Sequence, residues 1–197
     1  MFDVYIDARH KYRDNAVETA AIGANDLSQL GELGNEDTDS VMQFLGRRPV
    51  HTVVMSSFIQ DNGIVNPLNR GKFYGYFRED GELEGVALIG HTTLVEARSD
   101  RSLRAFALKA RYSETPINLI MSDGENAERF FGIYAVGGLV PRLKCTELLF
   151  QTDFPFPVQQ CSWEVKYARP EELMQTALAQ ADLLIRQFAS DCINLKN

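Results

Sequence analysis

The order of elements in the sequence predicts an α/β fold with a mixed, mostly antiparallel central sheet and helices on both faces. Two observations carry this prediction. Three strand-like runs follow one another between residues 72 and 97, and the second half of the chain alternates helical and strand patterns. A sheet built in this way has two faces to bury, and helices flanking the strands cover both of them.

The first half of the chain contributes one strand and several helical segments. Phe2–Ile6 alternates apolar and polar residues, as a strand does. Residues 14–33 are rich in alanine but interrupted by glycines, which predicts a short or broken helix. Thr38 or Asp39 can cap a helix that continues to Arg48, where Pro49 stops it. Residues 51–62 fit helical spacing and end at Gly63.

The centre of the chain predicts an antiparallel meander. Lys72–Arg78 is rich in aromatic residues, and Glu79-Asp80-Gly81 is a hairpin turn signal. Glu82–Ile89 then continues as an apolar strand, and His91–Ala97 forms a third. Strands joined this tightly pair antiparallel with their neighbours in sequence.

The second half alternates helices with strands. The predicted elements are a helix at 100–112 capped by Asp100, a strand at 117–121, a helix at 123–136, a strand at 142–151, a strand at 162–167 and a helix from Pro170 to Phe188. A stiff linker with two prolines occupies residues 151–160. We therefore expect a main domain over 1–160, followed by a strand and a helix over 161–197 that either complete its sheet or open a second domain.

Composition excludes several classes of function. Lys plus Arg is 20 and Asp plus Glu is 27, so the net charge is −7, which argues against nucleic acid and anionic membranes as partners. Three scattered cysteines and three distant histidines lack the spacing of zinc ligands, so no metal is expected. No membrane-spanning run or secretory signal is visible, which predicts a cytoplasmic protein.

Three stretches of the chain carry a family resemblance. They are the run from Gly71 to His91, the segment Phe130–Leu139, in which a tyrosine precedes a glycine by four residues, and the segment Trp163–Leu173. In this order they resemble the central meander, a late helix, and the opening strand and first helix of the GNAT acyl-CoA N-acyltransferase superfamily, in particular of the amino-terminal domain of bacterial tandem GNAT proteins. The resemblance spans residues 36–185 and implies acetyl transfer from acetyl-CoA to an amine.

The resemblance implies that the cofactor pyrophosphate would bind at the start of the helix after the meander. The family signature is Gln or Arg, two residues, Gly, one residue, and Gly or Ala. The matching residues are Arg98, Ser99, Asp100, Arg101, Ser102 and Leu103. Arg98 fits, but Arg101 and Leu103 replace the small residues, and Asp100 adds a negative charge that repels phosphate. This departure argues against cofactor binding in this domain.

The resemblance also supplies three candidate catalytic residues. Tyr134 occupies the position at which the family often has a general acid that protonates the leaving thiolate, or it is a core tyrosine beside two phenylalanines. Glu84 and Glu96, on the predicted meander, could polarise an attacking amine, or they lie on a solvated strand face.

Three functions follow from these patterns. The first is a degenerate GNAT domain, non-catalytic by itself, that supports a catalytic GNAT domain or a second copy of the chain. The second is an active acetyl-CoA-dependent N-acetyltransferase on an unknown amine. The third is a small-ligand or protein-binding module. Because the terminal helix carries an apolar stripe, it is expected to dock within the chain or on a second copy.

Overall fold

The computed structural model describes residues 2–6, 27–135, 139–147, 149, 151, 166 and 169–194. The chain divides into two compact units, Met1–Gln151 and Thr152–Asn197. The boundary expected at 160/161, the linker and the strand expected at 162–167 fall largely or wholly outside the described residues, as does most of the segment at 14–33. The division into a main domain over 1–160 and an appended segment therefore stays a prediction.

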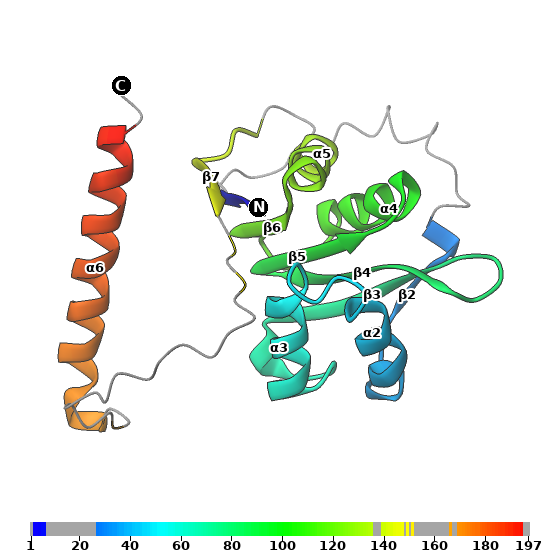
Figure 1. Cartoon of the computed structure of the whole chain (residues 1–197), viewed down its shortest axis with the longest axis horizontal. Helices are drawn as coiled ribbons and strands as arrows, with labels where there is room; N and C mark the ends of the chain where they lie inside the picture. Colours follow the sequence, from blue (N-terminus) through cyan, green and yellow to red (C-terminus); the bar gives the residue numbers. More distant parts are fainter. Residues whose placement is uncertain are drawn as a thin grey trace. The chain divides into compact units, whose positions relative to one another are not determined.

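The first unit is an α/β structure built on one mixed sheet. Its strands are β1 (Phe2–Ile6), β2 (Leu30–Glu32), β3 (Gly71–Phe77), β4 (Leu83–Gly90), β5 (Thr92–Ala97), β6 (Leu119–Asp123) and β7 (Leu143–Glu147). They are arranged in the order β2-β3-β4-β5-β6-β1-β7 (Figure 1). Every neighbouring pair is antiparallel except β5 and β6, which run parallel. The predicted mixed and mostly antiparallel sheet is thus confirmed.

The predicted meander is confirmed in the same sheet. β3 pairs with β4 from Gly71↔Gly90 to Phe77↔Leu83, and β4 pairs with β5 from Gly85↔Ala97 to Leu88↔Leu94. The hairpin between β3 and β4 turns at the expected position, where Gly81 has φ of 83° and its N–H donates to the Arg78 carbonyl at 2.9 Å. Glycine adopts this left-handed backbone without the steric penalty of a side chain.

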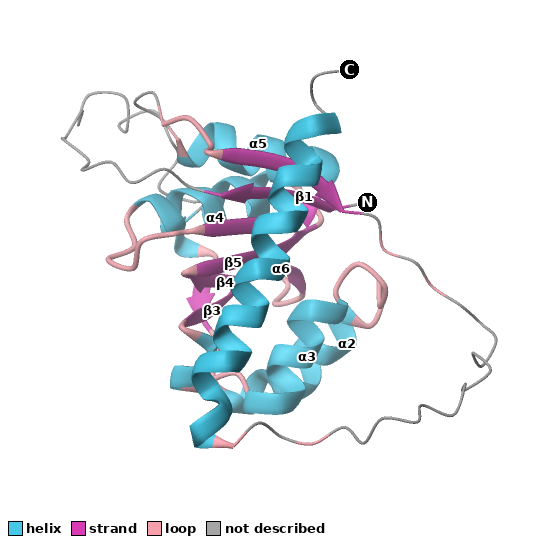
Figure 2. Cartoon of the chain, turned by 90° about the vertical axis from the view of Figure 1, so that its left-hand side faces the viewer, coloured by secondary structure: helices cyan, strands magenta, loops and turns pink. Residues whose placement is uncertain are grey.

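Helices cover both faces of the sheet. The described residues of the first unit form the helices α2 (Thr38–Leu45), α3 (Val53–Asn62), α4 (Asp100–Arg111) and α5 (Gly124–Tyr134), with short 3-10 turns at Asn35–Asp37 and Pro67–Asn69. Figure 2 shows the strands as a layer with α4 and α5 on one side and α2 and α3 on the other. All four helices lie where the sequence predicts them, although α2 ends three residues earlier than expected.

Each sheet face has its own apolar core, because successive side chains of a strand point to opposite faces. Ala87, Val95 and Phe106 belong to the core under α4 and α5. Val86 and Leu94 belong to the core under α2 and α3. From Gly85 onward, these two cores assign the other side chains of β4 and β5 to one face or the other.

The second unit contains a 3-10 turn at Pro170–Glu172 and the long helix α6 (Leu173–Asn194). The helix predicted from Pro170 is therefore present. Leu184 and Phe188, on its predicted apolar stripe, have side chains outside the description, so the docking of this helix stays a prediction. No helix in the described residues is long and apolar enough to cross a bilayer.

Candidate functional site

The parallel strands β5 and β6 separate towards their carboxyl ends. Their paired residues run only from Thr92↔Leu119 to Leu94↔Met121. Beyond this ladder, the Ser122 hydroxyl donates to the Val95 carbonyl at 2.8 Å. Ligands commonly bind beyond the carboxyl ends of parallel strands, so this opening is a candidate site.

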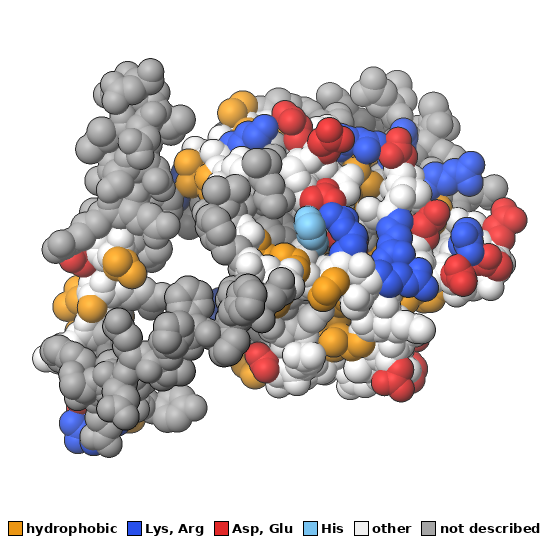
Figure 3. Space-filling view, viewed as in Figure 1, with side chains coloured by type: hydrophobic (Ala, Val, Ile, Leu, Met, Phe, Trp, Pro, Cys, Tyr) orange, Lys and Arg blue, Asp and Glu red, His pale blue; other side chains and the backbone are white. Residues whose placement is uncertain are grey.

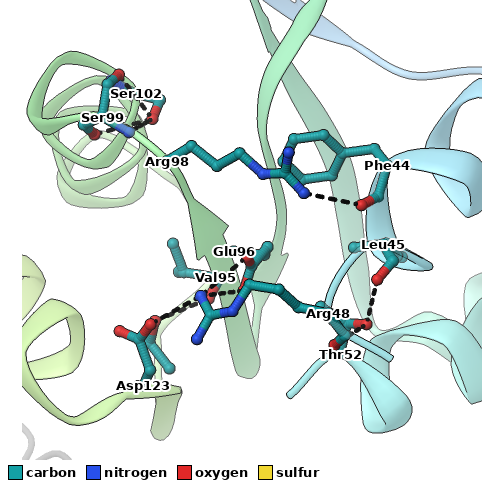
Figure 4. Close-up of polar contacts among 11 residues, drawn as sticks. Phe44, Leu45, Arg48, Thr52, Val95, Glu96, Arg98, Ser99, Ser102 and Asp123 are labelled. Atoms are coloured by element: carbon teal, nitrogen blue, oxygen red, sulfur yellow. Dashed lines mark hydrogen bonds and ion pairs between the residues drawn. The ribbon is translucent and has the colours of Figure 1, made fainter. Parts of the chain in front are cut away.

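A guanidinium occupies the opening between the two strands. Arg48, in the connection between α2 and α3, brings Nη1 to 3.1 Å from Glu96 Oε1 and 2.9 Å from Asp123 Oδ2 (Figure 4). Glu96 is on β5 and Asp123 is at the end of β6, and both fall on the sheet face that α2 and α3 cover. We call these three residues the Arg48 clasp.

Thr52 fixes the backbone that carries Arg48. The Thr52 hydroxyl lies 2.9 Å from the Leu45 carbonyl and 3.0 Å from the Arg48 carbonyl, and Thr52 is almost fully buried. The Thr52 N–H also donates to the Arg48 carbonyl, at 3.1 Å. The connection between α2 and α3 is therefore a closed turn, and it aims Arg48 at the strand gap.

The charges in the clasp are unequally exposed. The side chain of Glu96 is 6% exposed, that of Asp123 24% and that of Arg48 34%. Burial raises the pKa of Glu96, and the positive charge of Arg48 only partly offsets this effect. Burial also lowers the pKa of His51, which lies in the same connection, and the Arg48 charge lowers it further. The site thus holds a carboxyl whose pKa is raised and a histidine whose pKa is lowered.

A small cavity of about 20 Å³ borders the clasp. Its lining includes His51, Met55, Leu94, Glu96, Ser122 and Asp123. This volume is sufficient for about one water molecule, and the carboxylates and the Ser122 hydroxyl could hydrogen-bond it. Figure 3 shows basic side chains gathered beside acidic ones and a histidine on this side of the first unit.

The structure separates the three candidate catalytic residues. Glu96 lies in the clasp. Glu84 comes at the start of β4, half-exposed, at the irregularity in the pairing of β3 with β4. Tyr134 ends α5 and packs against the core on the opposite face, with ring centroids 6.4 Å from those of both Phe130 and Phe131. An acid at Tyr134 and a base at Glu96 therefore face different sides of the sheet.

The candidate cofactor residues surround the start of α4. Ser99, not Asp100, is the N-cap: its hydroxyl accepts from the Ser102 N–H at 3.1 Å. The Ser102 hydroxyl in turn accepts from the Ser99 N–H at 3.3 Å. The Leu103 N–H donates to the Ser99 carbonyl at 3.1 Å, and the Leu103 side chain is buried in the core. The Leu103 bond is the first regular bond of the helix, and of the four N–H groups that precede it those of Ser99 and Ser102 are bonded within the chain.

The charged members of this set are also engaged. Arg98 stacks over the Phe44 ring, 4.4 Å from its centroid, and donates to the Phe44 carbonyl at 3.2 Å. Asp100 pairs with Arg129 at 2.6 Å on the surface. Arg101 is exposed. Arg98 is therefore held on α2 instead of pointing freely at the helix start.

The sequence did not single out Arg48 and Asp123 as site residues. Arg48 was only the last residue of one predicted helix, and Asp123 only the first residue of another. The parallel pairing of β5 with β6 brings Asp123 beside Glu96, and the connection between α2 and α3 brings Arg48 to both. Among the described residues, no group of three His, Cys, Asp or Glu side chains is placed to hold a metal ion.

Comparisons with protein-family models, with curated proteins and with solved structures found no match to this chain.

Proposed function

We propose that the chain is a GNAT-like domain that does not catalyse acetyl transfer by itself and that supports a catalytic domain or another partner. The succession of meander, α4, parallel β6 and α5 is consistent with the resemblance seen in the sequence. Because a fold alone does not determine activity, the proposal has to rest on the site.

The start of α4 is the observation that carries the proposal. A pyrophosphate held at a helix start needs free N–H groups and little negative charge. Here the Ser99 hydroxyl accepts from the Ser102 N–H, the Ser102 hydroxyl accepts from the Ser99 N–H, and Asp100 places a carboxylate beside the two N–H groups that remain. The Arg129 guanidinium offsets part of the Asp100 charge, but an exposed ion pair is weak. It also does not free the N–H groups that the Ser99 and Ser102 hydroxyls occupy.

The second candidate is an active N-acetyltransferase, and Glu96 favours it. A general base works best when its pKa lies near the working pH, and burial shifts the pKa of Glu96 upward in that direction. In the structure, however, both Glu96 carboxylate oxygens contact Arg48, at 3.1 and 3.3 Å. An amine would have to displace this guanidinium before Glu96 could accept its proton.

Calorimetric titration of acetyl-CoA into the purified chain tests the proposal. We expect no binding at micromolar acetyl-CoA, and no thiol release when a panel of amines is added. The matched variant is Arg98→Glu, which reverses the one charge that fits the family signature. A one-site isotherm that this variant abolishes would contradict the proposal and favour the active enzyme.

A further inference from the structure

The helix α6 exposes large apolar side chains. It runs without a break from Leu173 to Asn194 (Figure 1). From Leu173 to Leu183 every side chain is exposed, and four large apolar ones are 62–70% exposed: Leu173, Met174, Leu178 and Leu183. A helix in a protein gains most of its stability by packing an apolar face, and a single helix in water is marginal. A partner surface would therefore stabilise α6.

The apolar residues of α6 follow the spacing of a coiled coil. They alternate steps of three and four residues along one stripe, and two further residues widen it on one flank: Met174, Ala177, Ala181, Leu184 and Phe188, with Leu178 and Ile185. We call these seven residues the α6 stripe. A repeat of about 3.5 residues keeps such a stripe against one partner helix along its length, here about 21 Å from residue 174 to residue 188. The spacing therefore favours another helix as the partner.

The α6 stripe is complementary to itself in size. Its first half contains the two alanines, Ala177 and Ala181, and its second half contains Leu184 and Phe188. In an antiparallel pair of α6 helices, the first half of one stripe lies against the second half of the other, so that small residues meet large ones. In a parallel pair, alanine would lie against alanine and leave the two helices poorly packed. Size therefore favours the antiparallel pair.

The charges beside the stripe are complementary in the same orientation. Asp182 and Arg186 lie one turn apart, on the flank that is widened. Antiparallel pairing about the middle of the helix sets this flank against itself with its direction reversed, so that Asp182 of each copy comes nearest to Arg186 of the other. Parallel pairing would set it against the opposite flank, which carries Gln180 and Gln187. Charges that flank a helix pair select the partner and its orientation.

We propose that α6 is a dimerisation helix, whose stripe packs antiparallel on the same stripe of a second copy of this chain. A two-fold axis near the middle of the helix relates the copies, so each contributes the same residues. One pair of helices of this length buries less than the roughly 1,600 Å² of a standard interface, so we expect a dissociation constant in the micromolar range. The dimer names one partner for the chain and does not rest on the proposed lack of acetyl-CoA binding.

Sedimentation equilibrium of the full chain tests the dimer. We expect a dimer at micromolar concentration that dissociates on dilution. Leu178→Asp places a carboxylate in the α6 stripe and should raise the dissociation constant at least about tenfold. Leu183→Asp is the matched control, because it makes the same substitution at a similarly exposed leucine on the opposite side of the helix, and it should leave the constant unchanged. A wild type that stays monomeric at tens of micromolar, or equal weakening by the two variants, would overturn the proposal.

A mixture of two charge variants tests the orientation. Arg186→Asp makes the widened flank wholly acidic and Asp182→Arg makes it wholly basic, so each variant alone should dimerise several-fold more weakly than the wild type. An equimolar mixture should form mainly the heterodimer, which native mass spectrometry distinguishes by its mass. A statistical mixture of the three dimers would overturn the antiparallel arrangement. Neither measurement uses acetyl-CoA, so a failure of this proposal is distinguishable from a failure of the proposed function.

Discussion

Glu96 and Asp123 lie on adjacent parallel strands and contact the same atom, Arg48 Nη1, at 3.1 and 2.9 Å. Their side chains differ fourfold in exposed fraction, 6% against 24%. The guanidinium therefore compensates a buried charge on one side and a partly hydrated charge on the other. Removal of the guanidinium should therefore destabilise the buried Glu96 carboxylate more than Asp123.

Arg48→Ala should destabilise the fold by about 2 kcal/mol at neutral pH. This is less than for a fully buried pair, because Arg48 is one-third exposed. The folded state binds a proton at Glu96 more tightly than the unfolded chain does, since burial raises the pKa of Glu96. Its contribution to stability therefore falls as pH rises through that raised pKa. Without Arg48 this fall in stability with rising pH should be larger. The stability difference between Arg48→Ala and the wild type should therefore be smallest in mild acid.

Urea unfolding at several pH values measures this dependence. Arg47→Ala is the control, because it removes the same charge one residue away and Arg47 is exposed. A loss of stability in Arg48→Ala that stays constant across pH would show that Glu96 is not the group involved.

Thr52→Val should cost about 0.5–1.5 kcal/mol, because the valine keeps the shape but removes the hydroxyl bond to the Leu45 carbonyl, which retains only the Arg48 N–H as donor. Thermal unfolding followed by circular dichroism checks this. Thr52→Ser retains the hydroxyl and should lose clearly less. Equal losses in the two variants would mean that the methyl group, not the hydrogen bond, holds the turn.

Gly85→Ala should destabilise the sheet by about 1–3 kcal/mol. A Cβ at Gly85 would lie 2.6 Å from Phe106 Cε2, and Phe106 is fully buried, so the ring has little room to move. Gly132→Ala is the opposite case. Gly132 is in α5 with no atom within 4 Å of the added carbon, so alanine should stabilise the helix by about 0.5–1 kcal/mol. Chemical denaturation measures the free energy of unfolding of both variants. A change in the same direction in both would refute the packing argument.

Ser99→Ala should cost about 1 kcal/mol, since it removes the hydroxyl that caps α4. Ser99→Thr preserves a capping hydroxyl and should remain near wild-type stability. Asp100→Asn should change little, because the Arg129 pair is exposed at the surface. Equilibrium unfolding measures the stability of these variants. If Asp100→Asn were less stable than Ser99→Ala, Asp100 would be the more important residue at this helix start.

The sequence predicts the local elements well because their signals are local. Phe2–Ile6 is a strand with the bounds expected from its alternation, and the Asp-Gly turn joins β3 to β4 where predicted. The cap of α4 was assigned one residue too late, since Asp and Ser are both good caps and only the hydrogen bond distinguishes them.

The candidate site was less predictable, because it depends on contacts distant in sequence. Glu96 was a candidate, but its exposure and its partners depend on β6 lying beside β5. Arg48 is 48 residues from Glu96 and 75 from Asp123, and no spacing rule connects them. Tyr134 was placed correctly in a helix, yet which face of the sheet that helix covers is a tertiary property.

The position of β1 has a consequence for how the chain is made. β1 lies between β6 and β7, so Phe2–Ile6 pairs on both edges with residues 119–123 and 143–147. A ribosome must translate more than a hundred further residues before the first of these partners exists. The meander, whose pairings are local, can form long before that. Translation should therefore yield a half-built sheet first, and the unpaired edge of β5 should remain a target for chaperones until β6 and β1 add to it.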